Sequence, residues 1–181
     1  MKELMKRTIL LLLTCMACSK RHTIKASMND ARWYGTGEAI EIHTKENMTC
    51  STDRFSLIAR TDGPFSKQDS SVTQILSFYH IPLEKGTYDL ALPDTCLPVK
   101  IARSTTTFTV SRASFHVLDT QTRKLQRYYE FTDGDQGWVK VMKLNRTAGK
   151  IKGRFEVSLT GIKGQKIRFK RGKFNSLLRT Q

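Results

Sequence analysis

The sequence predicts an all-β protein, an antiparallel sandwich or barrel of about 8–10 strands. Short apolar runs rich in β-branched and aromatic residues alternate with turn residues through most of the chain, as in proteins with many short strands. No window of helical length combines a 3.6-residue period with capping residues. The 181 residues suit one domain that is large enough to fold around its own apolar core.

The first 17 residues have the features of an export signal and are not expected to form part of the fold. Three basic residues precede a short apolar core at residues 9–13, and Ala17 supplies a small residue at the end of the segment. The apolar core is far shorter than the ~20 residues of a membrane-spanning helix.

This segment resembles the signal of bacterial lipoprotein precursors, in which a peptidase cuts before a cysteine that carries diacylglycerol. The resemblance implies that Cys18 is lipidated and begins the mature chain, with Cys15 as a weaker alternative. An ordinary secretory signal cut at another bond is the other interpretation. Several acyl chains on one cysteine hold a protein at a membrane, because each buried methylene contributes about 0.8 kcal/mol. We therefore expect a lipoprotein signal peptide over 1–17, the lipidated cysteine and a polar tether over 18–31, and a single all-β domain over 32–181.

Two cysteines, Cys50 and Cys96, remain in the mature chain once Cys18 carries lipid. Outside the cytoplasm they are candidates for a disulfide, which would stabilise the fold by about 4 kcal/mol on a chain-entropy argument. Two buried free thiols fit the spacing equally well. Neither cysteine belongs to a C-x-x-C pair, so the sequence predicts no redox or zinc site there.

Apolar runs and turn residues together place the strands along the domain. Turn residues include Asp-Gly-Pro at 62–64, Lys-Gly-Thr at 85–87, Asp-Gly at 133–134 and the glycines at 161 and 164. The predicted strands cover residues 39–44, 55–60, 72–80, 108–110, 113–119, 124–131, 138–143, 150–159 and 165–174.

The last two predicted strands carry the clearest pattern. Apolar side chains alternate there with polar or charged ones, which predicts a half-buried hairpin. A turn over 160–164 would place Phe155 opposite Phe169. The pair Arg171 and Gly172 interrupts the alternation and predicts a β-bulge.

Positive charge is concentrated towards the C-terminus. Residues 138–181 hold 13 Lys and Arg against one acidic residue, whereas the preceding 120 residues of the mature chain carry 15 bases and 14 acids. Five basic side chains of the predicted hairpin point to one solvent-facing side of the sheet. These candidate anion-binding residues are Lys152, Arg154, Lys166, Arg168 and Lys170.

A basic face of this kind attracts anions in a salt-dependent way. Outside the cytoplasm the available anions are lipid headgroups, lipopolysaccharide phosphates and acidic glycans. We expect no nucleic acid partner, because no recognition helix or RNA-binding motif accompanies the charge. A solvated face that only opposes edge-to-edge aggregation is the alternative interpretation.

The sequence contains no recognised catalytic, cofactor or metal motif. None of its histidines has a second ligand at a local metal-binding spacing. These histidines are His22, His43, His80 and His116. We therefore predict no enzyme, no metal and no cofactor.

Several stretches resemble a group of small Bacteroidota lipoproteins of unknown function. They are an entry motif at 24–33, a Gly-Thr-Tyr turn at 86–88, and closing strands at 139–157 and 167–174. The resemblance implies an all-β exported domain and brings no catalytic residues to transfer. This chain differs in its Lys- and Arg-rich closing strands. Basic residues directly after Cys18, where surface-exported relatives carry acidic ones, imply an outer-membrane anchor that faces the periplasm.

These observations predict a lipid-anchored envelope protein that binds anionic lipid, lipopolysaccharide or acidic glycan through its basic C-terminal hairpin, without enzymatic activity. A structural or accessory lipoprotein that contacts another envelope protein is the second hypothesis. A glycan-active enzyme is the third, and it would need clustered carboxylates in a cleft.

Overall fold

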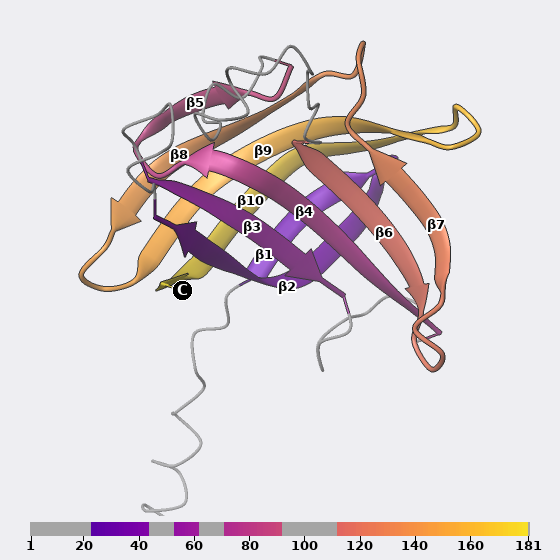
Figure 1. Ribbon diagram of the computed structural model, residues 1–181, viewed down its shortest axis with the longest axis horizontal. Helices are drawn as coiled ribbons and strands as arrows, with labels where there is room; N and C mark the ends of the chain where they lie inside the picture. Colours follow the sequence, from indigo (N-terminus) through magenta and orange to yellow (C-terminus); the bar gives the residue numbers. More distant parts are fainter. Residues whose placement is uncertain (1–22, 44–52, 62–70, 92–111, 181) are drawn as a thin grey trace, which may run out of the picture.

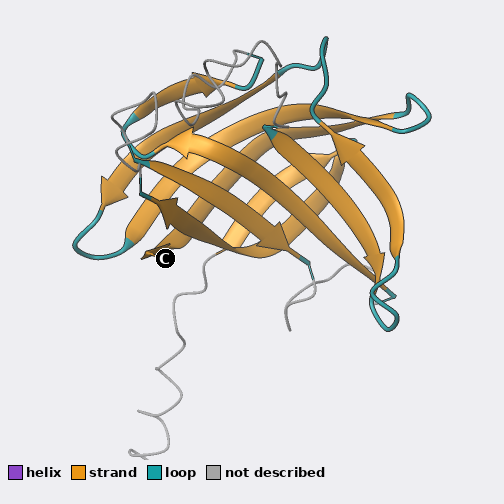
Figure 2. Cartoon of the chain, in the orientation of Figure 1, coloured by secondary structure: helices purple, strands orange, loops and turns teal. Residues whose placement is uncertain are grey.

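The computed structural model describes residues 23–43, 53–61, 71–91 and 112–180 (Figure 1). These residues contain no helix, and their strands form a single sheet (Figure 2), so the all-β prediction is confirmed. The strands are β1 (Thr23–Met28), β2 (Ala31–Ile42), β3 (Arg54–Arg60), β4 (Val72–Pro82), β5 (Gly86–Asp89), β6 (Ala113–Asp119), β7 (Leu125–Glu130), β8 (Gly137–Asn145), β9 (Lys150–Gly161) and β10 (Lys166–Thr180). Cys18, Cys50, Cys96 and the strand predicted at 108–110 lie outside the described residues.

The hydrogen-bonded pairs form a closed ring. They run from β1 through β2, β3, β4, β6, β7, β9 and β10, and β10 pairs with β1 again. Strand β8 also pairs with β9, and β5 pairs with β8. The last part of β10 runs parallel to β2, which corrects the wholly antiparallel prediction. Strand β1 lies between β2 and β10 and is antiparallel to both, so β2 and β10 run in the same direction. Because β1 is short, β2 and β10 pair directly with each other beyond its end.

The domain begins earlier than the sequence predicted. Part of the expected tether over 18–31 is strand β1, whose Ile24 is fully buried. A two-residue turn at Asn29 and Asp30, with φ of 46° and 67°, joins β1 to β2. Positive φ at both positions is typical of the tight hairpin turn that suits strand twist. Every described strand lies within residues 23–180, so a shortened protein of residues 19–181, which lacks Cys18, retains all of them.

Side chains from opposite parts of the ring meet in its interior. Phe169 on β10 contacts Trp33 on β2 with 5.5 Å between ring centroids and Phe115 on β6 with 5.1 Å. Phe78 on β4 lies 4.9 Å from Phe155 on β9. All five rings are buried, so the interior of the ring holds the apolar core. The charged side chains of the strands are exposed or half-buried, except those of Glu41 and Arg54, which are buried.

The last hairpin confirms the predicted alternation but corrects its register. Phe169 lies opposite Val157, and Phe155 lies opposite Gly172. The turn is shorter than predicted, since Gly161 N–H donates to the Gln165 carbonyl. The register then shifts between Phe169 and Gly172, which confirms the predicted bulge.

Candidate anion-binding surface

The five predicted anion-binding residues all lie on the outer face of the last hairpin. Lys152 and Arg154 are exposed on β9, and Lys166 and Arg168 are exposed on β10. Lys170 is half-buried beside the bulge. The corrected register places Arg154 opposite Lys173, which is not one of the five, so the five residues do not form one row.

A continuous row of basic residues crosses four strands, and the sequence prediction found only one of its members. Lys140 on β8 pairs with Arg154 on β9, Arg154 pairs with Lys173 on β10, and Lys173 pairs with Lys25 on β1. We call these four residues the basic row. Directly opposed residues have Cβ atoms about 5 Å apart, so four like charges follow one another across the sheet.

In the described part of the chain, the basic row has no carboxylate partner. Within the described ranges, no acidic side chain lies within ion-pair distance of Lys25, Lys140, Arg154 or Lys173. Lys25 Nζ does lie over the Tyr34 ring, 5.9 Å from its centroid. Unopposed like charges repel one another in the absence of a bound anion, and an anionic surface placed over the row would relieve that repulsion.

The basic residues nearer the β9–β10 turn are in a different electrostatic situation. Lys166 Nζ lies 3.3 Å from Oδ1 of the buried Asp135, and Lys170 Nζ lies 3.5 Å from Oδ1 of Asp30. Asp135 also accepts hydrogen bonds from Thr132 and Thr160. These partners offset part of the charge predicted for this end of the hairpin.

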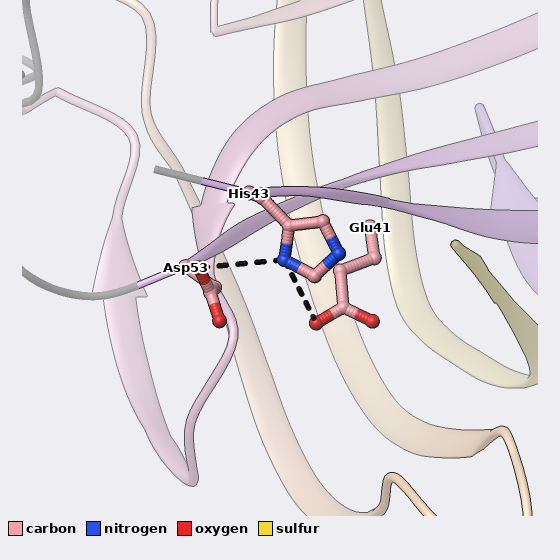
Figure 3. A group of neighbouring side chains, drawn as sticks. All are labelled: Glu41, His43 and Asp53. Carbon is pink, nitrogen blue, oxygen red and sulfur yellow. Dashed lines mark ion pairs between the residues drawn. The ribbon is translucent and has the colours of Figure 1, made fainter. Parts of the chain in front are cut away.

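Three further groups, which the sequence analysis kept apart, converge at the end of β2 (Figure 3). His43 follows β2, and its Nδ1 lies 4.0 Å from Oε1 of Glu41 and 3.7 Å from Oδ1 of Asp53. Glu41 is buried and His43 is exposed. Glu41 and His43 are two residues apart, a spacing that puts strand side chains on the same face and that the sequence analysis overlooked. Asp53 joins them because β3 pairs with β2.

Arg146 in the β8–β9 turn supplies positive charge to this cluster. Its Nη2 lies 3.1 Å from Oδ2 of Asp53, and its Nη1 lies 3.9 Å from Oε1 of Glu41. The ligand atoms of Glu41, His43 and Asp53 lie within 4.8 Å of one another, a separation at which they could surround a cation. Because the Arg146 guanidinium already pairs with both carboxylates, the arrangement works as an ion-pair network that holds the turn to β2 and to the start of β3.

Two titratable side chains on the paired strands β6 and β7 have altered acidity. Burial lowers the pKa of His116, which favours the neutral imidazole. Burial and the hydrogen bond to Glu130 raise the pKa of Tyr128 to about 12, so its phenol stays protonated at neutral pH. The two rings lie 4.9 Å apart and pack as neutral groups.

Comparison of the chain with protein-family models, with curated proteins and with solved structures finds no match. In the described ranges no helix has the length and apolarity that crossing a bilayer would require. Function is therefore inferred from the surface of the domain and from the N-terminal segment.

Proposed function

We propose that the protein is a lipid-anchored protein of the cell envelope whose β domain binds anionic lipid, lipopolysaccharide or acidic glycan, without catalysis. The basic row is the observation that carries the proposal. Four cations aligned over four strands, without carboxylate partners among the described residues, form an extended surface that matches a sheet of anionic headgroups better than a single small ligand.

The position of the N-terminus supports this proposal. Lys25 is seven residues after Cys18, and a fully extended chain spans at most about 3.5 Å per residue, or roughly 25 Å in this case. A lipid on Cys18 would therefore hold the nearest member of the basic row within that distance of a membrane. We place the anchor in the outer membrane, facing the periplasm.

Electrostatic attraction of this kind is moderate and adds to the lipid anchor. A basic residue close to an anionic membrane surface contributes about 1 kcal/mol, and the attraction falls within a Debye length of about 8–10 Å at physiological salt. Four residues in a row can therefore orient the domain on the surface, and raised salt should release that contact.

The test uses residues 19–181, which lack the lipidated cysteine, and vesicles that contain acidic phospholipid or lipopolysaccharide across a salt series. One variant reverses three charges of the basic row (Lys140→Glu, Arg154→Glu, Lys173→Glu). The matched control reverses three exposed bases elsewhere (Lys124→Glu, Arg127→Glu, Lys163→Glu).

The proposal predicts that the native domain binds, that salt weakens binding, and that only the row variant loses it. Equal losses in both variants would mean that net charge, and not the row, attracts the vesicles. Absence of native binding at low salt would contradict the proposal and favour the second hypothesis, contact with another envelope protein.

A further inference from the structure

A hollow with four lysines lies next to the basic row. It has a volume of about 430 Å³ and lies where β5, β8 and β9 meet. Of the residues that the structure describes, no acidic one lines it. The lining residues are Lys85, Met142, Lys143, Leu144, Asn145, Lys150 and Lys152.

A β-bulge in β8 gives the hollow both its charge and its apolar part. Val141 pairs with Gly153 and Lys143 pairs with Lys152, so Met142 is the extra residue between the two pairs. A bulge re-aims the side chains around it, and here both Met142 and Lys143 are exposed. Met142 is 44% exposed, and in the described ranges only Leu125 and Ile162 are large apolar residues with greater exposure.

The lysines of the hollow lie close together and have no acidic partner among the described residues. Lys143 lies directly opposite Lys152, and Lys85 precedes Gly86, which pairs with Val141 beside the bulge. In the part of the chain that the structure describes, none of the four lysines forms an ion pair. Asn145 Oδ1 accepts the Ala148 N–H, which leaves the amide NH₂ as a donor.

Four clustered lysines and a donor amide favour a compact group with more than one negative charge. A phosphomonoester carries about −1.5 to −2 at neutral pH and offers three strong acceptor oxygens, whereas a phosphodiester carries only one charge. Lysine binds phosphate as a point charge, so several lysines can approach one group without strict geometry. The exposed Met142 and the half-buried Leu144 give the hollow an apolar side that a free ion would not use.

We propose that this hollow binds the phosphomonoester headgroup of a lipid, with the lysines on the phosphate and Met142 beside the first part of the acyl region. The inference rests on the proposed function, because it names the ligand class and the place on the basic surface where it is held. The basic row provides general attraction to the membrane, and the hollow provides selectivity among anionic lipids.

The test compares vesicles that contain phosphatidate, a monoester, with vesicles that contain phosphatidylglycerol, a diester, at matched zeta potential. The hollow variant carries Lys85→Gln, Lys143→Gln, Lys150→Gln and Lys152→Gln. The matched control carries Lys25→Gln, Lys140→Gln, Lys163→Gln and Lys173→Gln, so it loses the same charge and keeps the hollow intact. Circular dichroism and urea unfolding establish that each protein is folded.

The native domain should bind phosphatidate vesicles at least about fivefold more tightly than phosphatidylglycerol vesicles, the ratio that about 1 kcal/mol represents. The hollow variant should lose this preference and still bind both vesicles, whereas the control should bind more weakly and keep the preference. Added inorganic phosphate at millimolar concentration should compete only slightly.

Three results would overturn parts of this account in distinguishable ways. If the native domain binds the two vesicles equally, or if both variants lose the preference to the same extent, the hollow does not select phosphomonoester lipids. Either result would leave the proposed function intact. Complete competition by inorganic phosphate would refute a lipid source for the group. Failure of the native domain to bind either vesicle would refute the binding of anionic lipid on which the inference rests.

Discussion

Replacement of Phe169 by alanine tests the packing that holds the basic surface in place. Phe169 is fully buried on β10, between the exposed Arg168 and the half-buried Lys170, and it contacts rings from β2 and β6. Truncation of a buried phenylalanine costs about 3–5 kcal/mol through lost transfer free energy and the cavity that remains. Because two edge-on aromatic contacts disappear together, we expect the upper part of that range.

Equilibrium urea unfolding of residues 19–181, followed by circular dichroism, measures this cost. The expected result for Phe169→Ala is a loss of about 4–5 kcal/mol in the free energy of unfolding, with a thermal midpoint lowered by roughly 10–15 °C for a domain of this size. Ile162→Ala is the control, because its side chain is 86% exposed in the β9–β10 turn. That change should stay within about 0.5 kcal/mol. A loss below about 1.5 kcal/mol for Phe169→Ala, with the denaturant slope unchanged, would refute the packing across the ring.

Three further perturbations follow from the same structure. Gly153→Ala should lower the urea midpoint strongly, because a Cβ there would lie 2.1 Å from the Lys140 carbonyl oxygen. His116→Gln should weaken the loss of stability between neutral pH and about pH 5, because the folded state disfavours protonation of His116 and its contribution is lost as pH falls below the ordinary value of 6.5. Hydrogen bonds from the backbone and side chain of Thr122 lower the pKa of Asp119, so Thr122→Val should raise that pKa in an NMR titration. The stabilisation from Asp119 is present above its unfolded pKa and is lost as pH falls through the lowered folded value.

Each of these expectations has an opposite result that would contradict it. An unchanged urea midpoint for Gly153→Ala would mean that β8 can move away from β9 at little cost. An unaltered pH profile for His116→Gln would show that the unfolded and folded states bind protons equally at this position. An unchanged pKa of Asp119 in Thr122→Val would mean that the hydrogen bond from the Thr122 hydroxyl does not contribute to lowering it.

The sequence predicted those elements whose two faces differ in polarity. The last hairpin was found because its apolar and charged residues alternate over both strands, a pattern that only one buried face explains. Strand β1 was missed because it is short and starts directly after a polar, basic segment. Ile24 is the one fully buried residue among those of β1 whose burial is described, and one residue gives too little periodicity to separate a strand from a tether.

Which basic residues lie side by side depends on the register between strands, and the alternation of apolar and charged residues does not fix that register. A shift of two residues leaves every side chain on its face but changes its partner across the sheet. The alternation therefore predicted that Arg154 faces solvent, but it did not reveal that Lys140 and Lys173 flank it. Lys25 joined the row only through β1, and Asp53 met Glu41 only through the pairing of β2 with β3.

Lysine footprinting can locate the surface of the domain that meets an anionic membrane. Residues 19–181 are acetylated briefly with and without anionic vesicles, and mass spectrometry measures the modification of each lysine. The account predicts protection of Lys25, Lys140 and Lys173 by the vesicles, loss of that protection at high salt, and unchanged modification of the exposed Lys124 and Lys163. Uniform protection of all lysines, or protection limited to Lys124 and Lys163, would contradict the claim that the basic row is the surface that meets the membrane.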